Sequence, residues 1–370
     1  VKLQRRITMK LRKSLASLCF LLFAFLFSMA ASAAGNLEVC FLDVGQGLSV
    51  LLSCDGHYAL YDGGDRDYSS RVVAHLQEQG VDSLDYVIAS HYDADHLNGV
   101  VGALNVFPAG QIWGPKDDSK DTRVYEAFVE AANAQGKEII QPQIGSTFPL
   151  GGAQLTVLGP CSENYADSNS YSIVVKVENG EDSFLLTGDA PMECEEEMLS
   201  AGEDLSCDVL CAGHHGSATS TSWDLLEAAL PSWCVISCGT GNDYGHPHEE
   251  TMEKLASMEI PVFRTDIQGD LVAFSAGSGI TWNIDPCNDY SSGDESPKAA
   301  LDASESVSAT ESPAPSEDAV SYVVNTNSGK FHLPSCSSVD QMSSKNRLDF
   351  TGTREELIAQ GYEPCKRCSP

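Results

Sequence analysis

Six consecutive residues, His91-Tyr-Asp-Ala-Asp-His96, constrain the fold and chemistry of this chain more than any other segment. They place two imidazoles and two carboxylates directly after the apolar, β-branched run from Leu84 to Ser90. Such a run predicts a strand, so the cluster falls in the loop before a helix that we expect from Leu97 onward. Imidazole and carboxylate ligands in one loop are typical of a zinc or manganese site. A solvated acidic turn with incidental histidines is the alternative.

Three further segments end predicted strands with side chains that can bind metal. Asp189 follows the apolar strand FLLTG, and its two oxygens can bridge two ions. His214 and His215 close another strand, and His246 lies in a Gly-His-Pro loop. Taken singly, each could be an ordinary turn residue. Together with the hexapeptide they predict two ions roughly 3.5–4 Å apart that share a hydroxide, the nucleophile of a hydrolase.

The hydrophobic pattern predicts two β-rich halves, each followed by helices. Strand-length apolar runs recur within 37–62 and 262–284 and at 84–90, 155–159, 172–177, 184–187, 209–212 and 233–237. Helical spacing is found at 71–79, 124–135, 223–229 and 249–258. This pattern indicates an α+β fold in which two sheets pack face to face with the helices outside.

The two ends of the chain differ in composition from the middle. Residues 1–34 begin with basic side chains and continue into an apolar run that ends in small residues, which predicts a cleaved signal peptide, with a retained anchor as the alternative. Residues 35–285 form the predicted hydrolase domain. Residues 286–320 are rich in Ser, Pro, Ala and acidic side chains and predict a disordered linker. Residues 321–370 predict a small second module.

Negative charge is concentrated in the predicted hydrolase domain. Residues 35–285 carry 9 Lys and Arg against 40 Asp and Glu. Such a domain repels polyanions, which argues against tight nucleic-acid binding unless metal ions or a local basic groove supply the attraction.

The expected signal peptide sets the expected compartment. The sequence after it has no apolar run of about 18 residues, so we expect a secreted or envelope-associated protein with no membrane span after cleavage. Export permits disulfides, and Cys40 with Cys54 is one candidate pair among the core cysteines.

The segments HYDADH, LLTGD and AGHHGS, in this order and spacing, resemble the metallo-β-lactamase superfamily. The resemblance is to the branch formed by the hydrolase domain of ComEC-type DNA-uptake proteins, which FLDVGQG, YDGG at 61–64, YGHPH at 244–248 and RTDIQGD also match. It covers residues 37–284 and implies an αββα sandwich with a dinuclear metal site. The implied activity is metal-dependent hydrolysis of a phosphodiester, with extracellular DNA as a candidate substrate.

The resemblance implies two ions, zinc or manganese, that share Asp189 as a bridging ligand. The first ion would be held by His91 and Asp93, and the second by Asp95, His96 and His214. The branch lacks the third first-site histidine of β-lactamases, which leaves the first site more open.

Other residues near the ions are candidates for catalysis or substrate contact. The candidate catalytic residues are Asp95, His215 and His246. The candidate substrate contacts are Asn169, Ser172, His246 and Arg264. The arginine could pair with a phosphate oxygen; a surface or ion-paired arginine is the alternative. His246 could instead serve only to turn the chain.

The C-terminal module contains four potential ligands for one structural zinc ion. His332 and Cys336 are three residues apart, and Cys365 and Cys368 form a C-x-x-C pair, which matches a closed site of one imidazole and three thiolates. A module this small buries little, so a metal would stabilise it. The segment resembles the Ada-type metal-binding module, whose ligands are normally all cysteines. A disulfide between Cys365 and Cys368 is the alternative.

Several other functions stay open at this point. The same site could hydrolyse another envelope ester, such as a phosphorylcholine ester, or a lactam. The core could also be catalytically idle, with the C-terminal module binding DNA or an envelope polymer. The intact ligand series favours an enzyme, because a decayed site usually loses ligands.

Overall fold

The computed structural model describes residues 34–117, 120–293, 320–326, 328–340, 342, 346–359, 361–368 and 370. The predicted signal peptide and most of the predicted linker lie outside these residues. The described chain stays in contact with the hydrolase domain beyond residue 285, because the Tyr290 hydroxyl donates a hydrogen bond of 2.8 Å to Ile260 O.

An eight-stranded sheet forms the first layer of the domain, with strand order β15-β14-β1-β2-β3-β4-β5-β6. Its strands are β1 Leu37–Phe41, β2 Val50–Cys54, β3 His57–Tyr61, β4 Leu84–Ile88, β5 Ala109–Trp113, β6 Ile139–Ile140, β14 Leu271–Ser275 and β15 Ile280–Trp282. The pairing is parallel from β3 to β6 and antiparallel elsewhere. The last two strands of the domain therefore close the sheet beside its first strand.

A seven-stranded sheet forms the second layer, with strand order β13-β12-β11-β10-β9-β8-β7. Its strands are β7 Thr147–Leu150, β8 Ala153–Gly159, β9 Val174–Asn179, β10 Asp182–Leu186, β11 Val209–Cys211, β12 Trp233–Ile236 and β13 Val262–Arg264. Strands β10 to β13 run parallel, so their carboxyl ends meet at one edge of the sheet.

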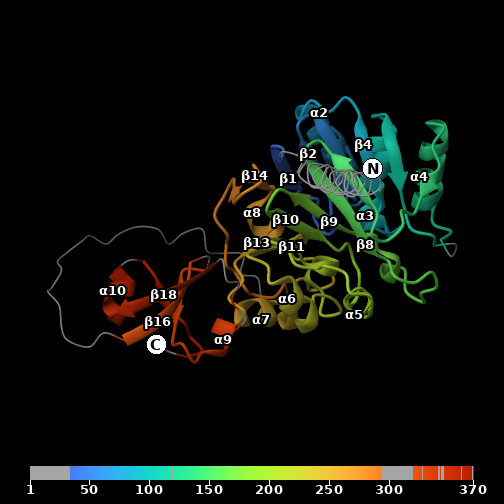
Figure 1. The fold of residues 1–370 in the computed structure, drawn as a ribbon. Helices are drawn as coiled ribbons and strands as arrows, with labels where there is room; N and C mark the ends of the chain where they lie inside the picture. The colour runs from blue at the N-terminus through green and yellow to red at the C-terminus, as the bar shows by residue number, and fades with distance from the viewer. Residues whose placement is uncertain are drawn as a thin grey trace, which may run out of the picture. The chain divides into compact units, whose positions relative to one another are not determined.

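Helices cover the outer face of each sheet, which confirms the expected α+β sandwich (Figure 1). The first sheet is covered by α2 Ser69–Glu78, α3 Ala94–Leu104 and α4 Arg123–Ala134, and the second by α5 Met192–Ala201, α6 Trp223–Ala229 and α7 Glu249–Ser257. Between the sheets lies an apolar core that includes Phe41, Trp113, Phe184 and Phe263.

Strand alternation decides which residues enter which core. Cys54 packs between the sheets, whereas Cys40 packs under the outer helices. The two residues lie on neighbouring strands, but β1 pairs Cys40 with Leu51. Successive side chains of a strand point to opposite faces, so these thiols are not bridged, and the described cysteines are all free.

The C-terminal module is a four-stranded sheet of order β18-β16-β17-β19 with two short helices. Its elements are β16 Val320–Asn325, β17 Lys330–His332, α9 Ser337–Asp340, β18 Arg347–Gly352, α10 Arg354–Ala359 and β19 Glu363–Pro364. One small apolar cluster contains Tyr322, Val324, Phe331 and Leu357, and a second contains Val323 and Val339 beside Cys336 and Cys365. Because so little apolar surface is buried, a bound metal ion would add substantially to the stability of the module.

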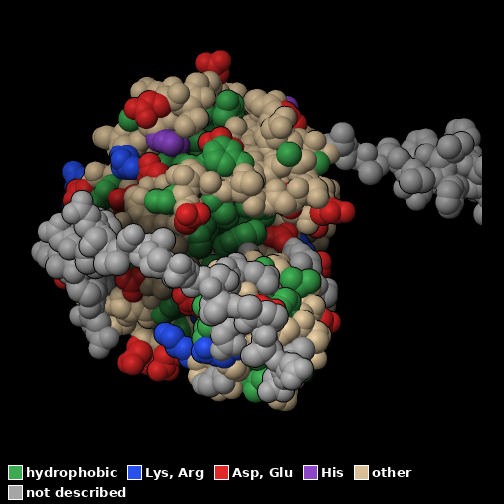
Figure 2. All heavy atoms as spheres, turned by 90° about the vertical axis from the view of Figure 1, so that its left-hand side faces the viewer, with side chains coloured by type: hydrophobic (Ala, Val, Ile, Leu, Met, Phe, Trp, Pro, Cys, Tyr) green, Lys and Arg blue, Asp and Glu red, His purple; other side chains and the backbone are tan. Residues whose placement is uncertain are grey.

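The surface reflects the acidic composition. Acidic side chains are scattered over the face shown in Figure 2, on which lysines and arginines are few. Among the described residues, none of the helices is both long and apolar enough to cross a lipid bilayer.

Candidate metal centre

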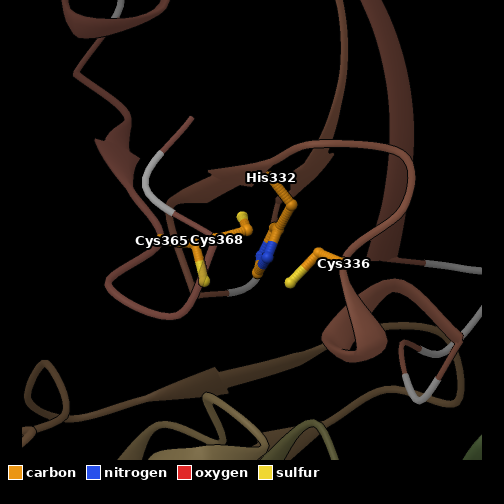
Figure 3. Close-up of side chains that lie close together, drawn as sticks. All are labelled: His332, Cys336, Cys365 and Cys368. Atoms are coloured by element: carbon orange, nitrogen blue, oxygen red, sulfur yellow. The ribbon is translucent and has the colours of Figure 1, made fainter.

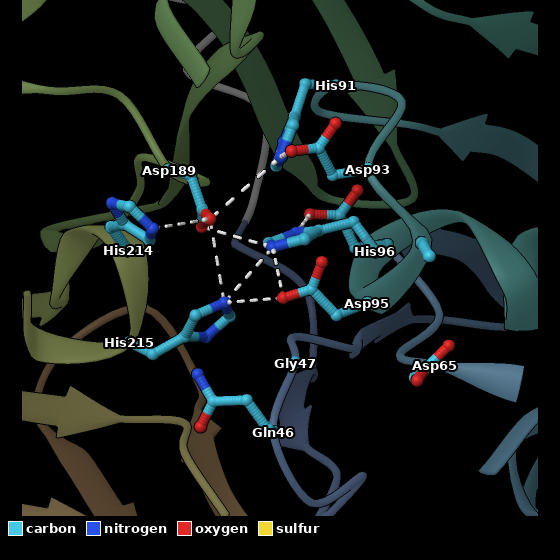
Figure 4. Close-up of polar contacts among 12 residues, drawn as sticks. Gln46, Gly47, Asp65, His91, Asp93, Asp95, His96, Asp189, His214 and His215 are labelled. Atoms are coloured by element: carbon cyan, nitrogen blue, oxygen red, sulfur yellow. Dashed lines mark hydrogen bonds and ion pairs between the residues drawn. The ribbon is translucent and has the colours of Figure 1, made fainter. Parts of the chain in front are cut away.

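Loops that follow β4, β10 and β11 bring the predicted ligands together at one edge of the sandwich (Figure 4). The hexapeptide follows β4, but α3 begins at Ala94, three residues earlier than expected. Asp93 is the N-cap, and its extended backbone starts the helix inside the motif. Asp95 and His96 are therefore fixed in the first helical turn.

Four ligand groups form one compact cluster. Potential ligand atoms of Asp95, His96, Asp189 and His215 all lie within 4.8 Å of one another. His96 Nε2 lies 3.1 Å from Asp189 Oδ1 and 3.2 Å from His215 Nε2, and His215 Nε2 lies 3.3 Å from Asp95 Oδ2. Two imidazoles and two carboxylates that converge in this way suit a divalent ion.

A second group of ligands shares the other oxygen of Asp189. Its Oδ2 lies 3.9 Å from His91 Nε2 and 3.7 Å from His214 Nε2. His91 Nε2 is also 3.8 Å from Asp93 Oδ2. The same oxygen lies 3.6 Å from His215 Nε2 of the compact cluster, so Asp189 contacts members of both groups and stands between them in Figure 4.

The two neighbouring histidines do not lie where the resemblance implied, since it gave His214 to the second ion and left His215 to touch substrate or a ligand. His215, and not His214, lies in the cluster with Asp95 and His96, while His214 faces the first group. Both residues have left-handed backbones, with φ of 57° and 52°, which turns their side chains to different sides. His215 Nδ1 is fixed by Ser237 O at 2.9 Å, and His214 Nδ1 by Thr219 Oγ1 at 3.2 Å.

The electrostatics of the centre fit positively charged ions. His91 Nε2 is buried with no hydrogen-bond partner among the described residues. Burial opposes protonation of His96 and His215, yet Asp189 raises the pKa of both imidazoles above the ordinary value. Burial would raise the pKa of Asp189, but His96 and His215 hold that pKa well below its usual range. The charges of this donor set suit two divalent ions.

Asp62 is a functional residue that we did not single out in the sequence. Its side chain is buried and accepts hydrogen bonds from Ser90 N at 2.7 Å and Ser90 Oγ at 2.7 Å, and it contacts His96 Nδ1 at 2.8 Å. The last contact aims His96 Nε2 at the metal centre. Asp62 belongs to the motif YDGG, which could have indicated its importance. The next residue of the motif, Gly63, packs so closely on α3 that a Cβ there would come within 2.2 Å of Val100 N.

The candidate substrate contacts divide into residues that face the centre and residues that do not. Asn169 Nδ2 lies 3.4 Å from His214 Nε2 and so reaches the first group. Ser172 is 1% exposed, and its hydroxyl accepts a hydrogen bond of 3.1 Å from Asp189 N. The expected substrate contact of Ser172 is therefore wrong, because this buried hydroxyl supports the Asp189 loop.

Arg264 does not face the metal centre either. Its side chain is completely buried, and its guanidinium holds Asp266 through contacts of 3.0 and 2.8 Å and Ser291 O at 2.7 Å. The expected phosphate contact is wrong, and the ion-paired alternative describes this arginine. The guanidinium N–H groups thus hold the segment around Ser291 against the segment around Asp266.

His246 packs beside the metal centre in a ladder of aromatic rings. Its ring centroid lies 5.4 Å from that of His214 and 5.7 Å from that of Tyr244, which is 67% exposed. Burial, His215 and His214 lower the pKa of His246 to about 3. The neutral ring therefore receives a hydrogen bond of 3.2 Å at Nδ1 from Gln46 Nε2, which leaves the proton on Nε2.

The C-terminal module gathers its four predicted ligands around one point (Figure 3). Ligand atoms of His332, Cys336, Cys365 and Cys368 lie within 4.8 Å of one another, with the imidazole between Cys336 and the other two thiols. Backbone amides support two of the sulfurs, from Leu333 N to Cys368 Sγ at 3.4 Å and from Arg367 N to Cys365 Sγ at 3.3 Å. This donor set fits a structural zinc ion.

One residue of the hydrolase domain reaches this second cluster. Glu259 follows α7, and its Oε2 lies 2.7 Å from His332 Nε2. Both side chains are buried. A carboxylate beside a metal-binding imidazole orients the ring and makes it a stronger ligand.

Two family profiles match the chain. The metallo-beta-lactamase superfamily matches residues 42–236, and the metal-binding domain of Ada matches residues 306–370. ComE operon protein 3 of Bacillus subtilis is 30% identical over 278 residues, which cover 68% of this chain and 34% of that protein. Recombination protein 2 of Haemophilus influenzae is 34% identical over 239 residues, which cover 63% of this chain and 28% of that protein.

The chain thus spans about a third of the length of these relatives. Among solved structures, the metallo-beta-lactamase fold protein YhfI of Bacillus subtilis aligns with a TM-score of 0.44 at 14% identity. The alignment covers 65% of this chain and 100% of YhfI.

Proposed function

Because this chain belongs to the metallo-β-lactamase superfamily, whose profile matches more than half of it, we propose that its metal-dependent hydrolase domain is a dinuclear phosphodiesterase. The observation that carries the proposal is Asp189, a buried carboxylate that lies within 3.1–3.9 Å of four imidazoles, those of His91, His96, His214 and His215. The names of two relatives, one a competence protein of Neisseria gonorrhoeae and one a recombination protein, make DNA the first polymer to test.

The ligand sets follow from the distances around Asp189. The first ion would be held by His91, Asp93, Asp189 and His214, and the second by Asp95, His96, Asp189 and His215. When bound, such ions supply Lewis acidity and an activated water. Three carboxylates against two divalent ions leave the centre with a formal positive charge, which attracts an anionic ester.

The residues around these ligands hold them in position. Asp62 aims His96, and Ser237 O aims His215. The Ser172 hydroxyl fixes the backbone of the loop that carries Asp189. With a pKa of about 3, His246 is neutral near pH 7, so its Nε2–H can donate a hydrogen bond to substrate but cannot protonate a leaving group.

The proposal also covers the cellular location of the enzyme and the binding partner of the C-terminal module. We place the enzyme outside the cytoplasm, which the composition of residues 1–34 supports. The C-terminal module would contact DNA or an envelope polymer. The six Lys and Arg residues of 321–370, against five acidic ones, are compatible with such a contact.

The first test combines metal analysis with activity. We expect the purified chain to contain three metals by mass spectrometry and to cleave bis(p-nitrophenyl) phosphate and DNA when zinc or manganese is supplied. Asp95→Ala should lose one metal and the activity, whereas Asp67→Ala, at an exposed acid outside the centre, should lose neither.

The substrate class is tested in the same assay. Protein with both domain metals bound that cleaves no phosphodiester would refute the proposal. Hydrolysis of p-nitrophenyl phosphorylcholine or of a chromogenic cephalosporin in place of DNA would instead identify the other ester or the lactam as substrate.

A further inference from the structure

We propose that Lys120 binds the phosphate group of the substrate beside the first metal site, an inference that rests on the proposed phosphodiesterase function. Lys120 lies between β5 and α4, and its Nζ donates a hydrogen bond to Asp93 Oδ1. It is the only lysine or arginine of the described part of the chain with a hydrogen bond or ion pair to a proposed ligand of the metal centre.

The position of Asp93 directs its carboxylate toward this lysine. Asp93 is the N-cap of α3, but its side chain makes no hydrogen bond to the helix amides. Its oxygens instead receive hydrogen bonds from Ser168 Oγ, at 3.2 and 3.3 Å, and from Lys120. The carboxylate is therefore turned away from the helix amides toward Ser168 and Lys120, and its side chain is 36% exposed.

The ammonium group of Lys120 needs an anion close by. The side chain is only 14% exposed, so it has given up much of its hydration. A divalent ion on Asp93 would draw the negative charge of this carboxylate to itself and weaken its attraction for the lysine. A phosphate oxygen bound beside the ion would replace the lost partner with a charge-assisted hydrogen bond.

Three other basic residues of the domain are already held by partners elsewhere. Arg264 is enclosed by Asp266 and Ser291. Arg71 and Lys176 pair with Asp270 and Asp204 at 2.6 and 2.8 Å. The domain has 9 basic against 40 acidic residues, so it repels a polyanion as a whole. Lys120, in contact with a proposed ligand of the first ion, would supply a local attraction for the phosphate group of such a substrate.

The test uses inorganic phosphate as the probe, so that it does not depend on turnover. Isothermal titration calorimetry on the full chain with its metals bound should show that Lys120→Ala weakens phosphate binding by roughly 10- to 100-fold. Lys120→Arg should restore most of the affinity. Lys116→Ala, at an exposed lysine of the same loop, should bind phosphate as the wild type does.

Metal content and kinetics separate the outcomes. The inference holds if Lys120→Ala keeps its metals, loses kcat/KM on bis(p-nitrophenyl) phosphate and keeps its rate on the neutral ester p-nitrophenyl acetate. Unchanged phosphate affinity, or a loss that only follows loss of metal, would overturn it. A wild type that binds phosphate through Lys120 but cleaves no phosphodiester would instead leave the inference standing and refute the proposed function.

Discussion

Asp62 shows how one buried carboxylate can control a metal site that it does not touch. Replacement by Asn keeps the shape and tolerates the left-handed backbone at this position, where φ is 59°. We expect Asp62→Asn to weaken binding of the second ion roughly 10- to 100-fold, because His96 loses the partner that orients it. Competition with a chromophoric chelator measures this affinity. Asp82→Asn, at an exposed acid, is the control, and equal affinities in the two variants would contradict the assignment.

The adjacent histidines offer a sharper comparison. His215→Ala should remove the second ion, since it takes away one of four converging ligands. His214→Ala should leave binding of that ion unchanged and lower the affinity for the first ion, because His214 Nε2 lies 3.7 Å from Asp189 Oδ2. Metal content after dialysis distinguishes the two variants. The reverse pattern would restore the order of roles that the sequence resemblance implied.

Metal binding should depend on pH in a direction set by the same imidazoles. Burial lowers and Asp189 raises the pKa of His96 and His215, and the raised value means that each ring keeps its proton to higher pH than a free histidine. A metal must displace these protons, so its affinity should rise with pH until both rings are neutral. Calorimetry in buffers of different ionisation enthalpy should detect proton release. Binding without proton release would refute this account.

The sequence predicted the kinds of ligand better than their individual roles. The hexapeptide and Asp189 could be predicted because acidic and imidazole side chains ended apolar strands. The roles of His214 and His215 could not, because two left-handed residues in succession decide which ring faces which ion. Burial of Arg264 against Asp266 likewise depends on a contact that composition does not reveal.

At the scale of elements, α5 supports the loop that leads into α6. Glu195 on α5 is fully buried, and it accepts hydrogen bonds from Thr221 N at 2.6 Å and Ser222 N at 2.8 Å. Glu195→Gln would place an amide donor against one of these donors. We expect a loss of about 1–3 kcal/mol in the free energy of unfolding, measured by chemical denaturation. Glu196→Gln, exposed on the same helix, should cost almost nothing; an equal loss in both would point to helix propensity instead.

Many helix and strand positions followed from periodicity, but α5 and β5 were not predicted, and neither was the assignment of strands to sheets. The expected closing strands at 262–284 are β13, which joins the second sheet, and β14 and β15, which join the first. The short helix α8, Thr265–Gln268, carries the chain across between them. Local pattern cannot predict this crossing, because β14 finds its partner in β1, more than two hundred residues earlier in the chain.

For the whole molecule, the two metal sites should be separable. Cys368→Ser removes one of four zinc ligands in the C-terminal module, so we expect the chain to retain two metals and its hydrolysis of bis(p-nitrophenyl) phosphate. Limited proteolysis should then cut within 320–370, because two small apolar clusters cannot hold the module alone. Cys161→Ser, outside both sites, is the matched control. A variant that keeps three metals would show that Cys368 is not a ligand.

The second ion would take its ligands from loops of both sheets, and this determines when during synthesis its site can form. Asp95 and His96 follow β4 of one sheet, whereas Asp189 and His215 follow β10 and β11 of the other. A nascent chain that has been synthesised only as far as β6 contains two of the four ligands, Asp95 and His96. The second metal site can therefore form only after both sheets have been synthesised and have packed together.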